Sequence, residues 1–205
     1  MTSLDFSSRN VTKLEIENDI LVVYPENHVP EKFSLIGVSS LICSNNQLTS
    51  LPLLPEGVKK LYCYTNCLLE LPSLPEGLEI LDCSDNQLTS LPLLPVGLKV
   101  LYCSRNHLTS LPPLPEGLTN LDCSKNCLTD LVISSKWMNE IACSKNPLKY
   151  VPFFEKRPWC LSVPESLKGC YSKENYQEGY RLQEINRHLF LIFFTKLGLQ
   201  LDFLI

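Results

Sequence analysis

Cysteine is the residue whose number and spacing in this chain most suggest chemistry. Ten are present, and six recur at intervals of 20 residues: Cys43, Cys63, Cys83, Cys103, Cys123 and Cys143. Thiols at such regular spacing could pair as disulfides or bind a metal ion. Zinc needs four convergent ligands, and no such set is evident, even with the C-x-x-x-C pairs Cys63/Cys67 and Cys123/Cys127. We therefore expect no metal site.

The remaining reactive residues do not indicate catalysis. The three histidines, His28, His107 and His188, share no recognisable motif. The sequence contains no H-E-x-x-H or G-x-S-x-G motif and no glycine-rich loop that would hold phosphates. We expect no enzyme activity, no catalytic residue and no cofactor. Lys and Arg (18) are nearly balanced by Asp and Glu (22), so we also expect no binding to nucleic acid.

The cysteines belong to an internal repeat of 20 residues. In each copy Leu or Ile precedes the cysteine by two positions, Asn follows it by three and Leu follows it by five. Prolines recur in L-P-x-L-P segments between the cysteines. A fixed period of this length predicts a solenoid, in which each copy packs only on its neighbours.

The spacing within a copy predicts one short strand followed by an extended return segment. Leu61 and Cys63 are two residues apart, so on a strand both point inward while Tyr62 points outward. The L-P-x-L-P segments disfavour a helix, because proline lacks an N–H and restricts the residue before it. Parallel strands about 4.8 Å apart would hold neighbouring cysteines slightly too far apart for a relaxed disulfide. We therefore expect buried free thiols.

The Asn column predicts how the turns are held together. After each strand the chain turns inward and leaves backbone groups away from water, and these groups must find partners. An Asn side chain offers both donors and an acceptor. We expect stacked Asn residues, such as Asn86, to hydrogen-bond the backbone of their own and adjacent copies.

The two ends of the chain depart from the repeat. We assign residues 1–36 to an N-terminal β cap, with strands near 14–16 and 20–23 joined by a turn, and residues 21–40 resemble a degenerate copy. We expect residues 153–205 to form a C-terminal cap, with a helix over 174–197. The alternative for 174–205 is an amphipathic helix that docks on a membrane, which would make the protein a membrane-associated adaptor.

The segment LEILDCSDNQLTSLPLLP resembles the leucine-rich repeat consensus LxxLxLxxNxLxxLP, with Cys in place of the third Leu. The resemblance covers six copies over residues 37–152 and is to the short bacterial-effector type, with similar copies in proteins of large DNA viruses. It implies a leucine-rich repeat solenoid with parallel strands on the concave face and an extended, proline-rich convex face. It further implies a protein–protein interaction platform. Some bacterial members carry a ubiquitin-ligase Cys-x-Asp motif, but Cys83-Ser84-Asp85 belongs to the repeat.

The candidate partner-binding residues are those on the strand face that differ between copies. Tyr and Arg are favoured in protein interfaces, and acidic and basic residues together suggest a partner of mixed charge. The set is Tyr62, Tyr64, Asp82, Tyr102, Arg105, Asp122 and Lys125. We expect a protein partner on the concave strand face and a monomeric chain.

Two features predict an intracellular, cytoplasmic location. The N-terminus lacks the basic and apolar regions of a signal peptide. Ten cysteines without such a signal favour a reducing compartment, which would be the host cytoplasm for an effector or a viral protein.

Overall fold

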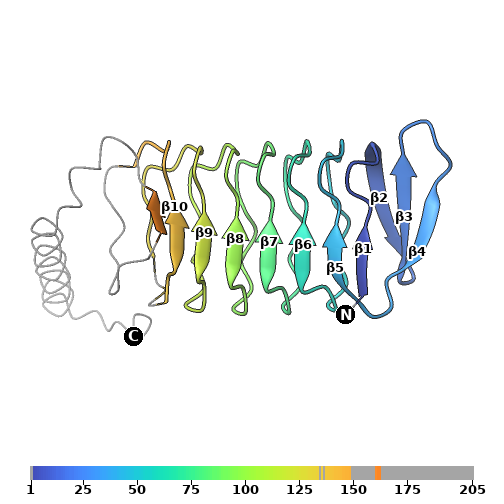
Figure 1. Cartoon of the computed structure of the whole chain (residues 1–205), viewed down its shortest axis with the longest axis horizontal. Helices are drawn as coiled ribbons and strands as arrows, with labels where there is room; N and C mark the ends of the chain where they lie inside the picture. The colour runs from blue at the N-terminus through green and yellow to red at the C-terminus, as the bar shows by residue number, and fades with distance from the viewer. Residues whose placement is uncertain (1, 134, 136, 149–159, 163–205) are drawn as a thin grey trace, which may run out of the picture. The chain divides into compact units, whose positions relative to one another are not determined.

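The computed structural model describes residues 2–133, 135, 137–148 and 160–162. Within this part of the chain there are eleven strands and no helix (Figure 1). The strands are β1 (Thr2–Asp5), β2 (Val11–Glu17), β3 (Ile20–Pro25), β4 (Glu31–Ser34), β5 (Val38–Ile42), β6 (Lys60–Tyr62), β7 (Ile80–Asp82), β8 (Val100–Tyr102), β9 (Asn120–Asp122), β10 (Glu140–Ala142) and β11 (Cys160–Ser162).

Strands β5 to β10 stack in sequence order as one parallel sheet, with β1 beside β5 and β11 beside β10. Each strand pairs with the next at a displacement of 20 residues, so that Leu61 lies between Leu41 and Leu81. The same register continues to Ile141 without a shift. The repeat therefore forms a solenoid of about five turns, as its period predicts, and Figure 1 shows the strands as a regular row.

The core of the solenoid consists of stacked columns of leucine and cysteine. Leu61 and Cys63 are completely buried, whereas Tyr62 between them is partly exposed, which confirms the predicted alternation. Strands β6 to β10 are only three residues long and end one residue before the cysteine. Cys63 nevertheless donates its backbone N–H to the carbonyl of Asp82 at 2.8 Å, so the pairing continues past the strand end.

The L-P-x-L-P segments connect the strands without forming a helix or strand of their own. Each segment is followed by a tight turn. In one copy, for example, the carbonyl of Pro75 accepts a hydrogen bond from the backbone N–H of Leu78 at 3.1 Å. The equivalent bond joins Pro55 and Val58. Because these turns recur at the repeat period, each connection returns the chain to the same place on the next strand.

The N-terminal residues form a second, antiparallel sheet in the order β2, β3, β4. The predicted pair of strands is present as β2 and β3, and Asn18 and Asp19 form their turn with φ of 49° and 61°. Residues 21–40 are not a degenerate copy, since β3 and β4 pair antiparallel and only β5 joins the main sheet. They have Val23 and Glu26 at the positions where the repeat has Cys and Asn.

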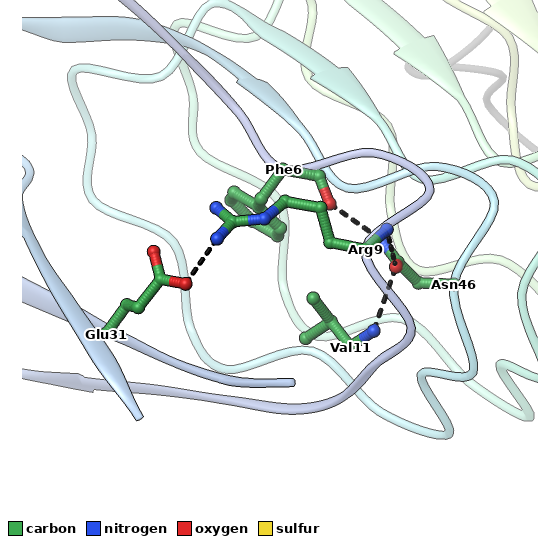
Figure 2. A network of polar contacts seen from close by, with 5 residues as sticks. All are labelled: Phe6, Arg9, Val11, Glu31 and Asn46. Carbon is green, nitrogen blue, oxygen red and sulfur yellow. Dashed lines mark hydrogen bonds and ion pairs between the residues drawn. The ribbon is translucent and has the colours of Figure 1, made fainter. Parts of the chain in front are cut away.

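Asn46, the first member of the Asn column, joins the N-terminal segment to the solenoid (Figure 2). Its amide nitrogen donates to the carbonyl of Phe6 at 3.1 Å, and its oxygen accepts from the backbone N–H of Val11 at 2.9 Å. Figure 2 also shows the ion pair between Arg9 and Glu31. The same side chain that links copies within the repeat therefore also fixes the segment before it.

The sequence-based assignment of residues 153–205 falls almost entirely outside the described residues. Its described part, β11, extends the main sheet by one parallel strand beside β10. The helix expected over 174–197, and with it the membrane-docking alternative for 174–205, lies outside the part of the chain that the structure describes. Within that part, no helix is long and apolar enough to cross a membrane.

Candidate functional site

The outward side of strands β6 to β10 carries two columns of partly exposed side chains. On each strand the central Leu or Ile is buried and the residues on either side of it are partly exposed. We call this surface the strand face. Its first column is Lys60, Ile80, Val100, Asn120 and Glu140, and its second is Tyr62, Asp82, Tyr102, Asp122 and Ala142.

Aromatic and acidic side chains alternate along the second column. Tyr62 is the direct register partner of Asp82, Asp82 of Tyr102, and Tyr102 of Asp122. Neighbouring strands in a sheet are about 4.8 Å apart, so each carboxylate lies between tyrosines or beside one. We call these four residues the Tyr–Asp row. Four of the seven predicted partner-binding residues are therefore immediate neighbours.

Partial burial of the Tyr–Asp row raises the pKa values of its acidic groups, because it disfavours their charged forms. Burial raises the pKa of Asp82, and the nearby Asp122 raises it further, although the Asp82 carboxylate accepts a hydrogen bond from the Ser84 backbone N–H at 3.1 Å. Burial also raises the pKa of Tyr102, with further contributions from Glu140 and both aspartates. The row therefore holds negative charge that is incompletely solvated and would be stabilised by an approaching cation.

A second row follows the turn after each strand, two positions beyond the repeat cysteine. All its members have a left-handed backbone, with φ between 54° and 57°: Asn45, Thr65, Asp85, Arg105, Lys125 and Lys145. We call this the turn row. The Arg105 side chain is exposed, and its Nη1 atom lies 3.9 Å from Oδ2 of Asp85. The Lys125 side chain is partly exposed. The predicted site residues Arg105 and Lys125 thus lie on this edge rather than on the strands.

The left-handed backbone of the turn row was not anticipated from the sequence. It allows the chain to leave the strand while Arg105 still donates its N–H to the carbonyl of Ser124 at 3.0 Å. Asn45 and Asp85 are residue types that tolerate positive φ, so they could have indicated a left-handed backbone at this position. Thr, Arg and Lys, which occupy it in the other copies, give no such indication.

Tyr64, the seventh predicted site residue, stands where other copies have serine. Its side chain is partly exposed. In the preceding copy the equivalent Ser44 is completely buried, and its hydroxyl has no hydrogen-bond partner among the described residues. Sequence reasoning also left out Ile80 and Val100, which are register partners on the strand face and give it an apolar part.

The six repeat cysteines form an unreactive core rather than a chemical site. The six repeat cysteines are buried and free, as predicted, while Cys67 and Cys127 are exposed and free. Burial raises the pKa of the Cys43 thiol to about 12 and holds that of Cys63 well above its usual range. Because the thiolate is the nucleophile and metal ligand, these thiols are inert. In the described ranges no group of three or more metal-binding side chains gathers.

Comparisons with known proteins identify the repeat. A family model described as leucine-rich repeats in two copies matches residues 76–116. Among solved structures, a Shigella effector leucine-rich repeat domain is 34% identical, with a TM-score of 0.63, and the match covers 78% of this chain and 66% of that one. No curated protein matches the sequence.

Two further solved structures are leucine-rich effectors from Yersinia. YopM from Yersinia enterocolitica is 35% identical over 62% of this chain, with a TM-score of 0.58. YopM from Yersinia pestis is 31% identical over 69% of this chain, with a TM-score of 0.59. The chain spans 28% and 42% of the lengths of these two proteins. The unbroken 20-residue register and these similarities together show that the chain is a leucine-rich repeat protein of the kind found in bacterial effectors.

Proposed function

We propose that this protein is an interaction platform that binds a partner protein on its strand face. The observation that carries the proposal is the Tyr–Asp row, in which large aromatic side chains and carboxylates alternate in register on an otherwise regular scaffold. Tyrosine contributes a large contact area with little loss of conformational freedom, and buried aromatic residues dominate many interfaces. The similarity to effector leucine-rich repeat proteins supports the same conclusion.

The strand face differs between copies where the scaffold does not. The buried Leu and Cys columns keep one residue type over successive turns, with Ile141 as the variant in the last one. The second column of the strand face instead changes from Tyr to Asp to Ala. A surface that varies on a constant framework can be specific for one partner without altering the fold.

The rival surface is the side of the solenoid formed by the L-P-x-L-P segments. It exposes the apolar side chains Leu53 and Leu93, which are 70% and 81% exposed. Val96, in the tight turn three residues after Leu93, is exposed as well. Such side chains could also contact a partner. They lack the charged groups that the strand face combines with its tyrosines.

The experiment compares one variant of each surface. The strand-face variant carries Tyr62→Ala and Tyr102→Ala together with Arg105→Ala on the adjacent turn row, and the matched control carries Leu53→Ser, Leu93→Ser and Val96→Ser. Proteins captured from a cell lysate are quantified by mass spectrometry. We expect the strand-face variant to lose the captured partner and to keep its melting temperature within about 2 °C. Undiminished capture by this variant, with loss in the control, would place the site on the opposite side.

We further propose that the protein works in the reducing interior of a cell. The six buried thiols of the repeat support this location, because free cysteines persist in reducing compartments.

A further inference from the structure

We propose that the Tyr–Asp row binds an extended polypeptide segment in the polyproline II conformation that carries two basic side chains three residues apart. This inference rests on the proposed function and specifies the chemistry of the partner. It follows from the register of the strands, the free oxygen atoms of two carboxylates and the apolar residues beside them.

The register sets the spacing of the two aspartates along the solenoid. Asp82 lies on β7 and Asp122 on β9, and both are direct register partners of Tyr102 on β8. Two strand spacings of about 4.8 Å separate their backbones by about 9.6 Å along the axis of the solenoid. A partner segment that follows this axis would need positive charges at that interval.

The polyproline II helix supplies this interval. It has three residues per turn and a rise of about 3.1 Å, so side chains three residues apart point the same way and are about 9.3 Å apart. A β-strand repeats its side-chain direction every two residues, or about 6.7 Å. An α-helix repeats its direction after seven residues, or about 10.5 Å. Of the three regular conformations, polyproline II lies closest to the interval of the row.

Each carboxylate keeps one oxygen for a ligand. The Oδ1 atoms of Asp82 and Asp122 accept the backbone N–H of Ser84 and Ser124, at 3.1 and 2.9 Å. The Ser84 side chain also interacts with the Asp82 carboxylate and lowers its pKa, but among the described residues no hydrogen bond to the Oδ2 atom of either aspartate is found. The backbone bonds fix the side-chain orientation, so a guanidinium group meets a prepared acceptor and less conformational entropy is lost.

The residues around the carboxylates suit the other positions of such a segment. Tyr62 and Tyr102 flank Asp82, and aromatic side chains form the walls of grooves that bind proline-rich segments. Tyrosine rings also attract the cationic group of arginine. Ile80 and Val100 add an apolar strip on the same strands.

The turn row favours the Tyr–Asp row for a basic group most clearly beside Asp122. Asp85, Arg105 and Lys125 stand three residues beyond Asp82, Tyr102 and Asp122 on the same copies. Arg105 lies 3.9 Å from Asp85, so these two opposite charges offset each other. The positive charge of Lys125 opposes a cation at its own edge and favours it over the Tyr–Asp row.

The test uses three fluorescent proline peptides of nine residues, each with two arginines and the same composition. The arginines are separated by two, three or four positions, and binding to the whole chain is measured by fluorescence anisotropy at low and physiological salt. We expect the three-position peptide to bind at least about fivefold more tightly than the others, with an affinity that falls as salt rises. Equal affinities for the three peptides would overturn the proposal.

Variants locate the binding. We expect two separate variants, Asp82→Asn and Asp122→Asn, each to lower the affinity for the three-position peptide at least about fivefold. The neutral amides can still accept the hydrogen bonds from the backbone N–H groups of Ser84 and Ser124. Asp130→Asn is the control, because Asp130 is an exposed carboxylate outside the strand face, and it should leave affinity within about twofold. Unchanged binding in both aspartate variants would overturn the proposal. If peptide binding fails but the strand-face variant still loses its lysate partner, only the partner chemistry is wrong.

Discussion

The side-chain nitrogen of Asn86 donates a hydrogen bond of 3.0 Å to the backbone carbonyl of Cys63, in the preceding turn of the solenoid. The oxygen of the same amide accepts the backbone N–H of Leu68, also in the preceding turn, at 3.0 Å. A third contact, from the nitrogen to the carbonyl of Cys83, stays within its own turn at 3.1 Å. One buried side chain therefore satisfies backbone groups of two successive copies.

Replacing this amide should destabilise the solenoid. Asn86→Ala leaves the N–H of Leu68 and the carbonyl of Cys63 without their partner in a buried setting, and we expect the free energy of unfolding to fall by about 1–3 kcal/mol. Urea unfolding followed by circular dichroism measures the change. Gln87→Ala, at the exposed next position, is the control and should change stability by less than about 0.5 kcal/mol. Equal effects of the two substitutions would contradict the role given to Asn86.

The repeat could be predicted from the sequence because each of its columns has a simple physical cause. Burial explains the Leu and Cys columns, and the need of buried backbone for partners explains the Asn column. Strand β1 could not be predicted in the same way. Its partner is β5, more than 30 residues away, and only its Leu4 is less than fully exposed, so no alternating pattern marks it.

The turn row offers a stabilising substitution. Thr65 has φ of 54°, a left-handed conformation that a β-branched residue adopts with strain. Thr65→Asn should therefore raise the free energy of unfolding by about 0.5–1 kcal/mol. The reciprocal variant Asn45→Thr, at the equivalent position of the preceding copy, should lower it by a similar amount. Loss of stability in Thr65→Asn would show that the threonine side chain makes a compensating contact.

Burial should divide the cysteines into two kinetic classes. In a Cys160→Ser, Cys170→Ser background, which leaves only the cysteines that the structure describes by side chain, an aromatic disulfide reagent at pH 8 should react quickly with Cys67 and Cys127. The six repeat thiols should react only as the chain unfolds. The absorbance of the aromatic thiolate that the reagent releases measures the rate and the number of thiols in both classes. Adding Cys67→Ser and Cys127→Ser should remove the fast phase, and a persisting fast phase would mean that the core admits the reagent.

The buried thiols should also make the fold sensitive to alkali. Burial raises the pKa of Cys43 from its ordinary value of about 8.5 to about 12, so between these values the unfolded chain loses a proton that the folded chain retains. Stability therefore falls as the pH rises through this window, by up to about 1.4 kcal/mol per pH unit for each such thiol.

Unfolding measured in urea with a reductant at several values between pH 8 and 10.5 tests this linkage. Cys43→Ala should make the decline with pH shallower, although it also lowers stability at neutral pH by removing a buried group. Cys67→Ala is the control, because Cys67 is exposed in the folded chain and is solvated in both states. Identical slopes in the two variants would exclude the buried thiol as a source of the alkaline decline.

The candidate site could be predicted less completely than the fold. The alternation of Tyr62, Asp82, Tyr102 and Asp122 is visible in the sequence once the period of 20 is known, and the register confirms that these residues are neighbours. The division between strand face and turn row depends on a positive φ that the residue types at Arg105 and Lys125 do not reveal. The charge of the row likewise depends on how far burial affects Asp82, which is a property of the folded chain.

The bonds made by the Asn column affect how the number of copies can change during evolution. Asn86, Asn106 and Asn126 each connect their own turn to the one before it, and none of their hydrogen bonds within the described residues reaches a more distant turn. A gene that gained or lost one block of twenty codons by unequal recombination would therefore encode a longer or shorter spiral whose junctions are already complete. The length of the solenoid can therefore change by whole repeats during evolution, and no new type of contact between copies is needed.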